Sequence, residues 1–222
     1  NLGRIAGELP HLNKLARTSD GPGWEVVGED ILRGVLTRGG PALFFSGHIG
    51  NWEMLPVILA KLGIPMASIY RALSNSAVND AVNAMRRRGA GLDLPLFPKG
   101  AIGAREAIAH LKRGGYLGML VDQKMNDGIP VKFFGQNVMT APALAAMALR
   151  FRCPVIPGHI QRLGPARFRL EVEPPLELPN SGDRQRDIVK VMRRVNQTLE
   201  RWIIDEPGAW LWLHRRWPKN RK

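Results

Sequence analysis

Short apolar runs alternate with helical patterns along most of this 222-residue chain. The apolar runs are bounded by glycine and proline, and they predict strands at residues 42–46, 66–70, 94–97, 116–121, 155–160 and 167–172. Apolar residues at helical spacing predict helices at residues 51–62, 76–88, 102–112, 143–151 and 183–204. Strands that alternate with helices indicate an α/β protein, with a mixed, mostly parallel sheet covered by helices in a single domain over residues 1–222.

The last predicted helix has the clearest pattern. Its apolar residues predict a face that docks on the rest of the protein: Ile188, Val191, Met192, Val195, Leu199, Trp202 and Ile203. Basic residues occupy other positions of the same helix: Arg184, Arg186, Lys190, Arg193, Arg194 and Arg201. That basic face is either solvated or in contact with an anionic surface, and the pattern leaves both open.

The net charge of the chain is more informative about its partners than the overall composition is. The chain is 45% hydrophobic and 23% charged, which is ordinary for a globular protein, but its net charge is +13. Such a surplus favours anionic partners: nucleic acid, acidic lipid headgroups, phosphorylated substrates or an acidic carrier protein. The single cysteine, Cys153, excludes an intramolecular disulfide and is predicted to be a buried small residue. The histidines outside the segment described below lack ligand spacing, so we expect no metal and no other cofactor.

The ends of the chain bear on membrane attachment. No stretch reaches the roughly 18 apolar residues needed to span a bilayer. The chain begins with Asn1, and residues 1–4 have the character of the middle of a helix. We therefore expect that residues precede this segment in the natural protein, and that a membrane anchor among them is absent from this chain.

The most informative segment is SGHIGNWE at residues 46–53, between a predicted strand and a predicted helix. Two glycines flank its histidine and isoleucine, which allows a tight turn and a close approach by a substrate. We expect Asn51 to cap the helix, which places Glu53 in the first turn. An imidazole near a carboxylate can deprotonate a hydroxyl at neutral pH. The segment thus predicts a transferase or hydrolase with His48 and Glu53 as its catalytic pair.

The spacing of this pair is weak evidence without its context. Five histidines and 19 acidic residues in the chain place roughly 0.4 acidic residues at that spacing by chance. In a continuous helix, residues five apart point about 140° away from each other. A histidine on the turn before the helix escapes that restriction and can fold back toward Glu53.

Further blocks follow this segment in order. They are Tyr70-Arg71 with a helix ending in Arg86-Arg87-Arg88, then Asp122-Gln123, VKFFG at 131–135, and WLHRR at 212–216. Together with residues 46–53, these blocks resemble the lipid A biosynthesis acyltransferases, the lauroyl and myristoyl acyltransferases of the glycerolipid acyltransferase superfamily with its His-x4-Asp/Glu motif. The resemblance covers nearly the whole chain and implies a glycerolipid acyltransferase-like fold.

The resemblance also implies a reaction. An acyl chain would move from a thioester to a hydroxyl, with His48 as the general base and Glu53 as the acid that orients it. The implied substrate-binding residues are Arg71, Asp122, Gln123, Phe134, Gly135, Arg215 and Arg216. Two assignments stay open: the oxyanion donors are backbone N–H groups at 47–50 or Arg71, and Asp122 either positions the acceptor or braces Arg71.

The implied partners are an acyl-acyl carrier protein or acyl-CoA donor, a phosphorylated glycolipid acceptor and an anionic membrane surface, without nucleic acid. The implied location is the cytoplasmic face of a bacterial inner membrane. Three features depart from the family's pattern: its hydrophobic N-terminal helix is missing, Ala72 follows Arg71 where the family often has proline, and residues 124–130 after Gln123 differ in a way that bears on acceptor or chain-length preference.

Two other functions stay open. One is a lysophospholipid or glycerol-phosphate acyltransferase that uses the same His-Glu chemistry. The other is a basic membrane- or nucleic-acid-binding module without enzymatic activity, for which the net charge is the only support.

Overall fold

The computed structural model describes residues 2–91, 93–213 and 215–217. Among these residues, seven strands form a sheet in the order β1-β9-β8-β2-β5-β3-β4. The strand bounds are β1 Gly23–Val27, β2 Ala42–Ser46, β3 Met66–Tyr70, β4 Leu96–Pro98, β5 Tyr116–Leu120, β8 Val155–Gly164 and β9 Arg167–Val172. Strands β8, β2, β5, β3 and β4 run parallel, whereas β9 is antiparallel to β8 and carries β1 parallel to itself. The predicted mixed, mostly parallel sheet is confirmed.

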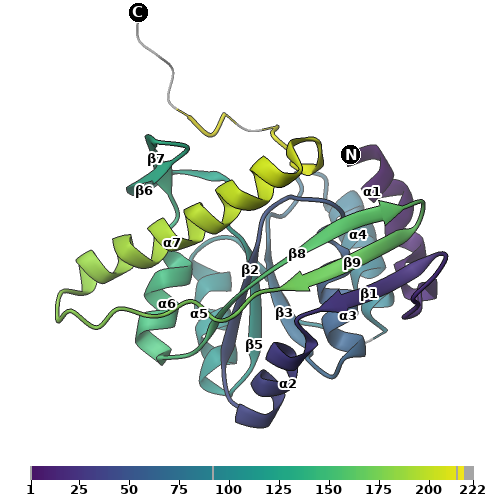
Figure 1. Cartoon of the computed structure of the whole chain (residues 1–222), viewed down its shortest axis with the longest axis horizontal. Coiled ribbons are helices and arrows are strands. Elements are labelled where there is room, and N and C mark those ends of the chain that lie inside the picture. The colour runs from purple at the N-terminus through teal and green to yellow at the C-terminus, as the bar shows by residue number, and fades with distance from the viewer. Residues whose placement is uncertain (1, 92, 214, 218–222) are drawn as a thin grey trace, which may run out of the picture.

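Helices cover both faces of this sheet (Figure 1). Their bounds are α1 Leu2–Glu8, α2 Glu29–Arg38, α3 Met54–Lys61, α4 Ser76–Ala90, α5 Ala101–Lys112, α6 Ala143–Phe151 and α7 Arg184–Asp205. Two short 3₁₀ helices, η1 Leu9–Lys14 and η2 Pro207–Ala209, follow α1 and α7. Strands β6 Lys124–Phe133 and β7 Gln136–Thr140 form a separate antiparallel hairpin beside α7.

Strand β2 shows why helices are needed on both faces. All of its residues are buried, and successive side chains of a strand point to opposite faces of the sheet. Leu43 and Phe45 belong to a core with buried residues of α5, α6 and α7, whereas Phe44 belongs to a core with α2 and α3. The protein is therefore a three-layer α/β/α structure with one apolar core on each side of the sheet.

Helix α7 docks through the apolar face that its sequence predicts, and all seven residues of that face are buried. Asp183 caps the helix, since its side chain accepts hydrogen bonds from the N–H groups of Gln185 and Arg186. In Figure 1 the helix runs beside the hairpin of β6 and β7, which it contacts. Among the described residues, no helix combines the length and the apolar character that crossing a membrane requires.

The structure corrects the predicted start of α3. This helix begins at Met54 rather than at residue 51. Asn51 is fully buried, and its amide donates to Glu8 Oε2 at 2.7 Å, so it does not cap the helix. Glu53 consequently lies just before the helix instead of in its first turn.

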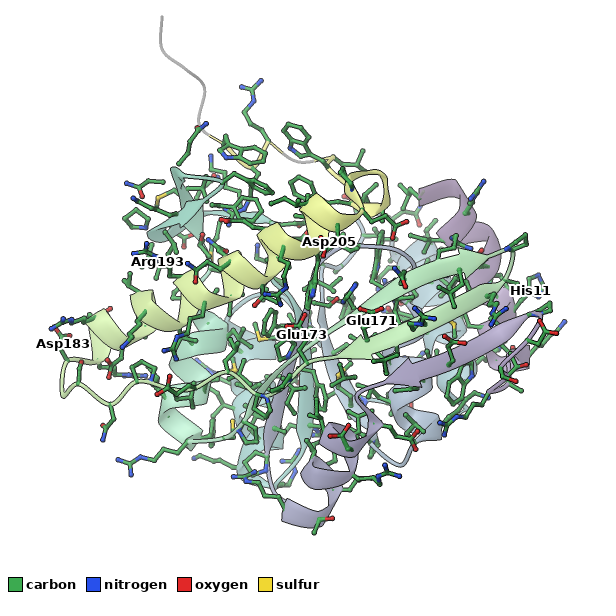
Figure 2. All side chains as sticks on the ribbon, viewed as in Figure 1. His11, Glu171, Glu173, Asp183, Arg193 and Asp205 are labelled. Atoms are coloured by element: carbon green, nitrogen blue, oxygen red, sulfur yellow. The ribbon has the colours of Figure 1, made fainter. Side chains whose placement is uncertain are left out.

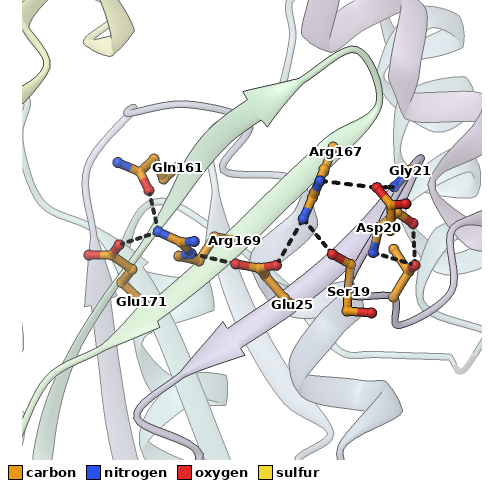
Figure 3. Close-up of polar contacts among 9 residues, drawn as sticks. Ser19, Asp20, Gly21, Glu25, Gln161, Arg167, Arg169 and Glu171 are labelled. Atoms are coloured by element: carbon orange, nitrogen blue, oxygen red, sulfur yellow. Dashed lines mark hydrogen bonds and ion pairs between the residues drawn. The ribbon is translucent and has the colours of Figure 1, made fainter.

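The other predicted strands and helices are confirmed with shifts at their ends, and β8 runs on to Gly164. Strand β1 and helix α2 were not predicted. Strand β1 lies at the edge of the sheet, and charged side chains hold it to β9: Glu25 accepts hydrogen bonds from Arg169, at 2.7 Å, and from Arg167 (Figure 3). The strand has only five residues, GWEVV, and Glu25 interrupts its apolar ones, so its hydrophobic signal is weak.

Candidate active site

The topology brings two distant segments together at one edge of the sheet. Strands β2 and β5 are parallel neighbours, and their last residues, Ser46 and Leu120, are register partners. His48 and Asp122 each stand two residues beyond the end of their strand. The carboxyl ends of parallel strands meet at the same edge, so these two side chains face each other across the sheet.

His48 and Asp122 form a direct hydrogen bond. The distance between His48 Nδ1 and Asp122 Oδ1 is 2.8 Å. The Asp122 side chain is 2% exposed, and the His48 side chain is 18% exposed. A carboxylate only accepts hydrogen bonds, so Nδ1 carries the proton and Nε2 carries the lone pair of the neutral imidazole. His48 is thereby set up to take a proton through Nε2.

The surroundings of Asp122 keep it ionised. Burial opposes its charge, but hydrogen bonds from His48 and Trp210, together with the positive charge that His48 acquires, outweigh burial and lower the pKa of Asp122. Trp210 Nε1 donates to the second carboxylate oxygen, Oδ2, at 3.0 Å. A charged Asp122 stabilises the imidazolium that forms when His48 accepts a proton.

Glu53 has a different partner from the one that the sequence suggested. Arg86 of α4 donates to both of its oxygens, from Nε to Oε2 at 2.9 Å and from Nη2 to Oε1 at 2.6 Å. Arg86 also donates to Asn83 at 3.3 Å. Burial lowers the pKa of Arg86, but the hydrogen bond and charge of Glu53 raise it further. The predicted His48–Glu53 pair is not confirmed: His48 pairs with Asp122, and Glu53 pairs with Arg86.

Two features fix the turn that carries His48. Gly50 adopts φ of +59°, and a Cβ there would lie 1.9 Å from the carbonyl oxygen of Ile160, so glycine is required. The Trp52 ring contacts the His48 ring edge-on, with the centroids 4.8 Å apart. The N–H of Gly50 donates to the carbonyl of Ala209 at 3.1 Å. That N–H is therefore engaged within the protein rather than directed at a substrate oxyanion.

Arg71 and Gln123 lie at the same edge of the sheet. Arg71 directly follows β3, which is the parallel neighbour of β5 on the side away from β2, and it is exposed. Gln123 follows Asp122 and is half-buried. Both residues thus occupy places from which a bound substrate could be contacted.

Phe134 and Gly135 form the two-residue turn of the β6–β7 hairpin. Both have positive φ, 48° and 75°, which fits a type I′ turn. The N–H of Phe134 donates to Glu200 Oε1 of α7 at 2.7 Å, and its ring packs on Phe133 and Trp217. The structure gives these two residues a role in fixing the hairpin; their predicted contact with substrate stays a prediction.

The two C-terminal arginines differ in burial. Arg215 is exposed. Arg216 is 2% exposed, and it donates to the carbonyl of Met139 at 2.8 Å and to Thr140 Oγ1 at 2.9 Å. Burial lowers the pKa of Arg216 to about 10, opposed by the charge of Asp122. Arg216 thus anchors the C-terminal segment to β7, and its implied contact with substrate stays a prediction. His214 of the same motif lies outside the described residues.

Two cavities border this region. A small one of about 10 Å³, about one water molecule in size, is lined by Asp122, Gln123, Trp210, Leu211, Trp212 and Arg216. A larger one of about 240 Å³ is lined in part by Ile49, and Glu171, Glu173 and Asp205 on its wall are labelled in Figure 2. His159, Arg201 and Glu206 add further polar groups to the larger cavity. This charged lining does not suit an acyl chain.

A histidine held by a buried carboxylate at the carboxyl edge of an α/β sheet is an arrangement that general acid–base chemistry can use. The family model described as bacterial lipid A biosynthesis acyltransferase matches residues 1–219. The chain therefore belongs to the bacterial lipid A biosynthesis acyltransferase family. Membership makes it an enzyme that transfers an acyl group from a donor to a lipid acceptor.

Other comparisons add little to this assignment. No curated protein matches the chain. Among solved structures, it is similar to the crystal structure of the 1-acyl-sn-glycerophosphate (LPA) acyltransferase, PlsC, from Thermotoga maritima, with a TM-score of 0.44 and 16% sequence identity over 81% of this chain and 73% of that chain. A similarity of this size does not inform the site.

Sequence reasoning missed two residues at this site, since neither Trp210 nor Arg86 was among the predicted site residues. Asp122 was predicted to position the acceptor or brace Arg71, but its role as the partner of His48 was not. The order of the strands would have revealed the His48–Asp122 pair. The sequence contains no local signal for the contact between Trp210 and Asp122, which lie 88 positions apart.

Proposed function

We propose that this protein transfers a fatty acyl chain from an acyl thioester, carried by acyl carrier protein or CoA, to a hydroxyl of a lipid A precursor. The single observation that supports the reaction type best is the 2.8 Å hydrogen bond between His48 Nδ1 and buried Asp122. It leaves Nε2 free of a proton, in the state that a general base needs.

The reaction would need no serine or cysteine nucleophile. His48 Nε2 takes the proton of the acceptor hydroxyl while that oxygen attacks the thioester carbonyl. The tetrahedral intermediate then collapses: the C–S bond breaks, the ester remains on the acceptor, and the thiolate leaves with the proton from His48. Throughout, Asp122 holds the imidazole and offsets its positive charge, as the acid does in a Ser-His-Asp triad.

Glu53 has a supporting role in this proposal. Its two hydrogen bonds to Arg86 join the segment before α3 to α4, beside the turn that carries His48. Arg71, exposed at the same edge, is the candidate for binding the acceptor phosphate, since a guanidinium fork matches phosphate oxygens.

The net charge of +13 supports the proposed partners. An acidic carrier protein, a phosphorylated glycolipid and the anionic cytoplasmic leaflet of a bacterial inner membrane all carry negative charge, so each is attracted to a basic protein. We therefore place the reaction at that membrane surface.

The test offers the purified protein a panel of acceptors with one acyl thioester donor at a time. The acceptors are a lipid A precursor, a lysophospholipid and glycerol phosphate, and the donors are acyl carrier protein and CoA thioesters. Mass spectrometry should show that the lipid A precursor gains the mass of one acyl chain, and that His48→Ala protein does not produce this gain. Acylation of the lysophospholipid alone would assign the protein to phospholipid synthesis. Salt-sensitive oligonucleotide binding without acyl transfer to any acceptor would contradict the enzymatic proposal altogether.

A further inference from the structure

The segment after α7 lies against the turn that carries His48. The N–H of Leu211 donates to the carbonyl of His48 at 2.8 Å, and the N–H of Gly50 donates to the carbonyl of Ala209 at 3.1 Å. Ile49 and Trp210 form an antiparallel bridge between the two segments. The catalytic turn is thus paired, backbone to backbone, with a part of the chain that follows the last helix.

Trp210 of this segment reaches the acid of the His48–Asp122 pair. Its indole Nε1–H donates to Asp122 Oδ2 at 3.0 Å, while Oδ1 of the same carboxylate bonds to His48 Nδ1 at 2.8 Å. Each oxygen of this buried carboxylate therefore has its own donor. Rotation of the carboxylate about its Cβ–Cγ bond would break both hydrogen bonds at once, so the two donors fix its plane.

The Trp210 ring is itself held in place. It stacks on Trp212, with the planes 11° apart, and contacts the rings of Phe133 and Trp217 edge-on. Arg216 lies over the Phe133 ring at 5.0 Å, and its two hydrogen bonds to β7 fix the end of the segment. A donor on such a packed ring acts as a preorganised dipole rather than as a mobile one.

We propose that Trp210 is a positioning residue for the reaction: its indole N–H orients the Asp122 carboxylate so that Oδ1 holds the Nδ1–H tautomer of His48. This inference rests on the proposed function. By stabilising the ionised carboxylate, the indole N–H also keeps the transferred proton on His48 rather than on Asp122. The C-terminal segment then completes the active site through the contact of Trp210 with Asp122.

The test is Trp210→Phe, which keeps an aromatic ring and removes the donor. We expect kcat to fall about 10- to 100-fold, the range for one hydrogen bond to a charged group, while KM for donor and acceptor stays within about twofold. The low-field NMR signal of His48 Nδ1–H should shift upfield or broaden. The matched control is Trp24→Phe in β1, which removes the indole hydrogen bond from Trp24 to the carbonyl of Leu15 (3.2 Å). The control should lose stability but keep its kcat and its His48 signal.

The outcomes separate this inference from the proposed function. An active wild type whose kcat and His48 signal are unchanged by Trp210→Phe overturns the positioning role and leaves the acyl transfer intact. If the wild-type protein shows no acyl transfer, the proposed function is refuted. The His48 Nδ1–H signal, compared between the wild type and Trp210→Phe, then still tests whether Trp210 positions the pair. If Trp210→Phe does not fold, the reciprocal measurement uses Asp122→Asn. The NMR signal of the Trp210 indole N–H should then move upfield, while the signal of the Trp24 indole N–H stays in place. An unmoved Trp210 signal overturns the inference.

Discussion

Replacing Asp122 by asparagine tests which carboxylate serves His48. The substitution keeps the size of the side chain, but the amide group can offer an N–H to Nδ1 of His48. The imidazole then favours the Nε2–H tautomer, which cannot accept a proton where the reaction needs it.

The expected loss is large. A wrong tautomer together with the lost charge on Asp122 should lower kcat about 10³- to 10⁴-fold, or about 4–5.5 kcal/mol of transition-state stabilisation. KM should change little, since Asp122 acts through His48. Steady-state acyl-transfer kinetics on the folded variant, checked by circular dichroism, measure this directly.

Glu53→Gln is the matched comparison, because it also replaces a carboxylate by an amide. Loss of the Glu53 carboxylate breaks the charge pair with Arg86, so we expect the free energy of unfolding to fall by about 1–3 kcal/mol. We expect kcat to fall by less than about tenfold. The reverse order, with Asp122→Asn nearly active and Glu53→Gln inactive but folded, would refute the pairing of His48 with Asp122 and restore Glu53 as the orienting acid.

Three further predictions concern substrate binding and stability. Arg71→Ala should raise KM for the phosphorylated acceptor about tenfold with kcat near wild type, and a fall in kcat alone would remove Arg71 from phosphate binding. Burial of His159 lowers its pKa to about 4 from 6.5. The stability that its neutral form provides is therefore complete above pH 6.5 and is lost as the pH falls toward 4. Denaturant titrations should show a loss in the free energy of unfolding of up to about 3 kcal/mol over this range, and His159→Phe should not show it. Gly50→Ala should lower the free energy of unfolding by about 2–4 kcal/mol, because its Cβ would meet the carbonyl oxygen of Ile160, and unchanged stability would show that the turn can shift.

The elements with strong hydrophobic periodicity were predictable from the sequence. Strands β2, β3 and β9 have the predicted bounds, because their apolar runs end sharply at glycine, proline or polar residues. Helix α7 was predictable for the same reason, since its apolar face is continuous. Strand β6 escaped prediction because polar residues, a glycine and a proline interrupt its apolar residues, and it gains its order from the turn at Phe134 and from α7.

The site was only partly predictable. The turn with His48 could be recognised from its glycines and from the strand before it. Its partner could not, because the contact depends on β5 lying next to β2, and the sequence gives no strand order. The proximity of Glu53 along the chain suggested a pair that Arg86 instead forms from another helix. Contacts of this kind are set by tertiary packing, which local spacing does not encode.

The central claim is that His48 is the base of a lipid acyltransferase. The most direct measurement is the single-turnover rate of acyl transfer from a thioester to a lipid A precursor, compared between the wild type and a folded His48→Ala variant. The account predicts that the wild type adds one acyl chain and that the variant is slower by at least about 10³-fold. A folded His48→Ala protein that transfers the acyl chain at nearly the wild-type rate would contradict it.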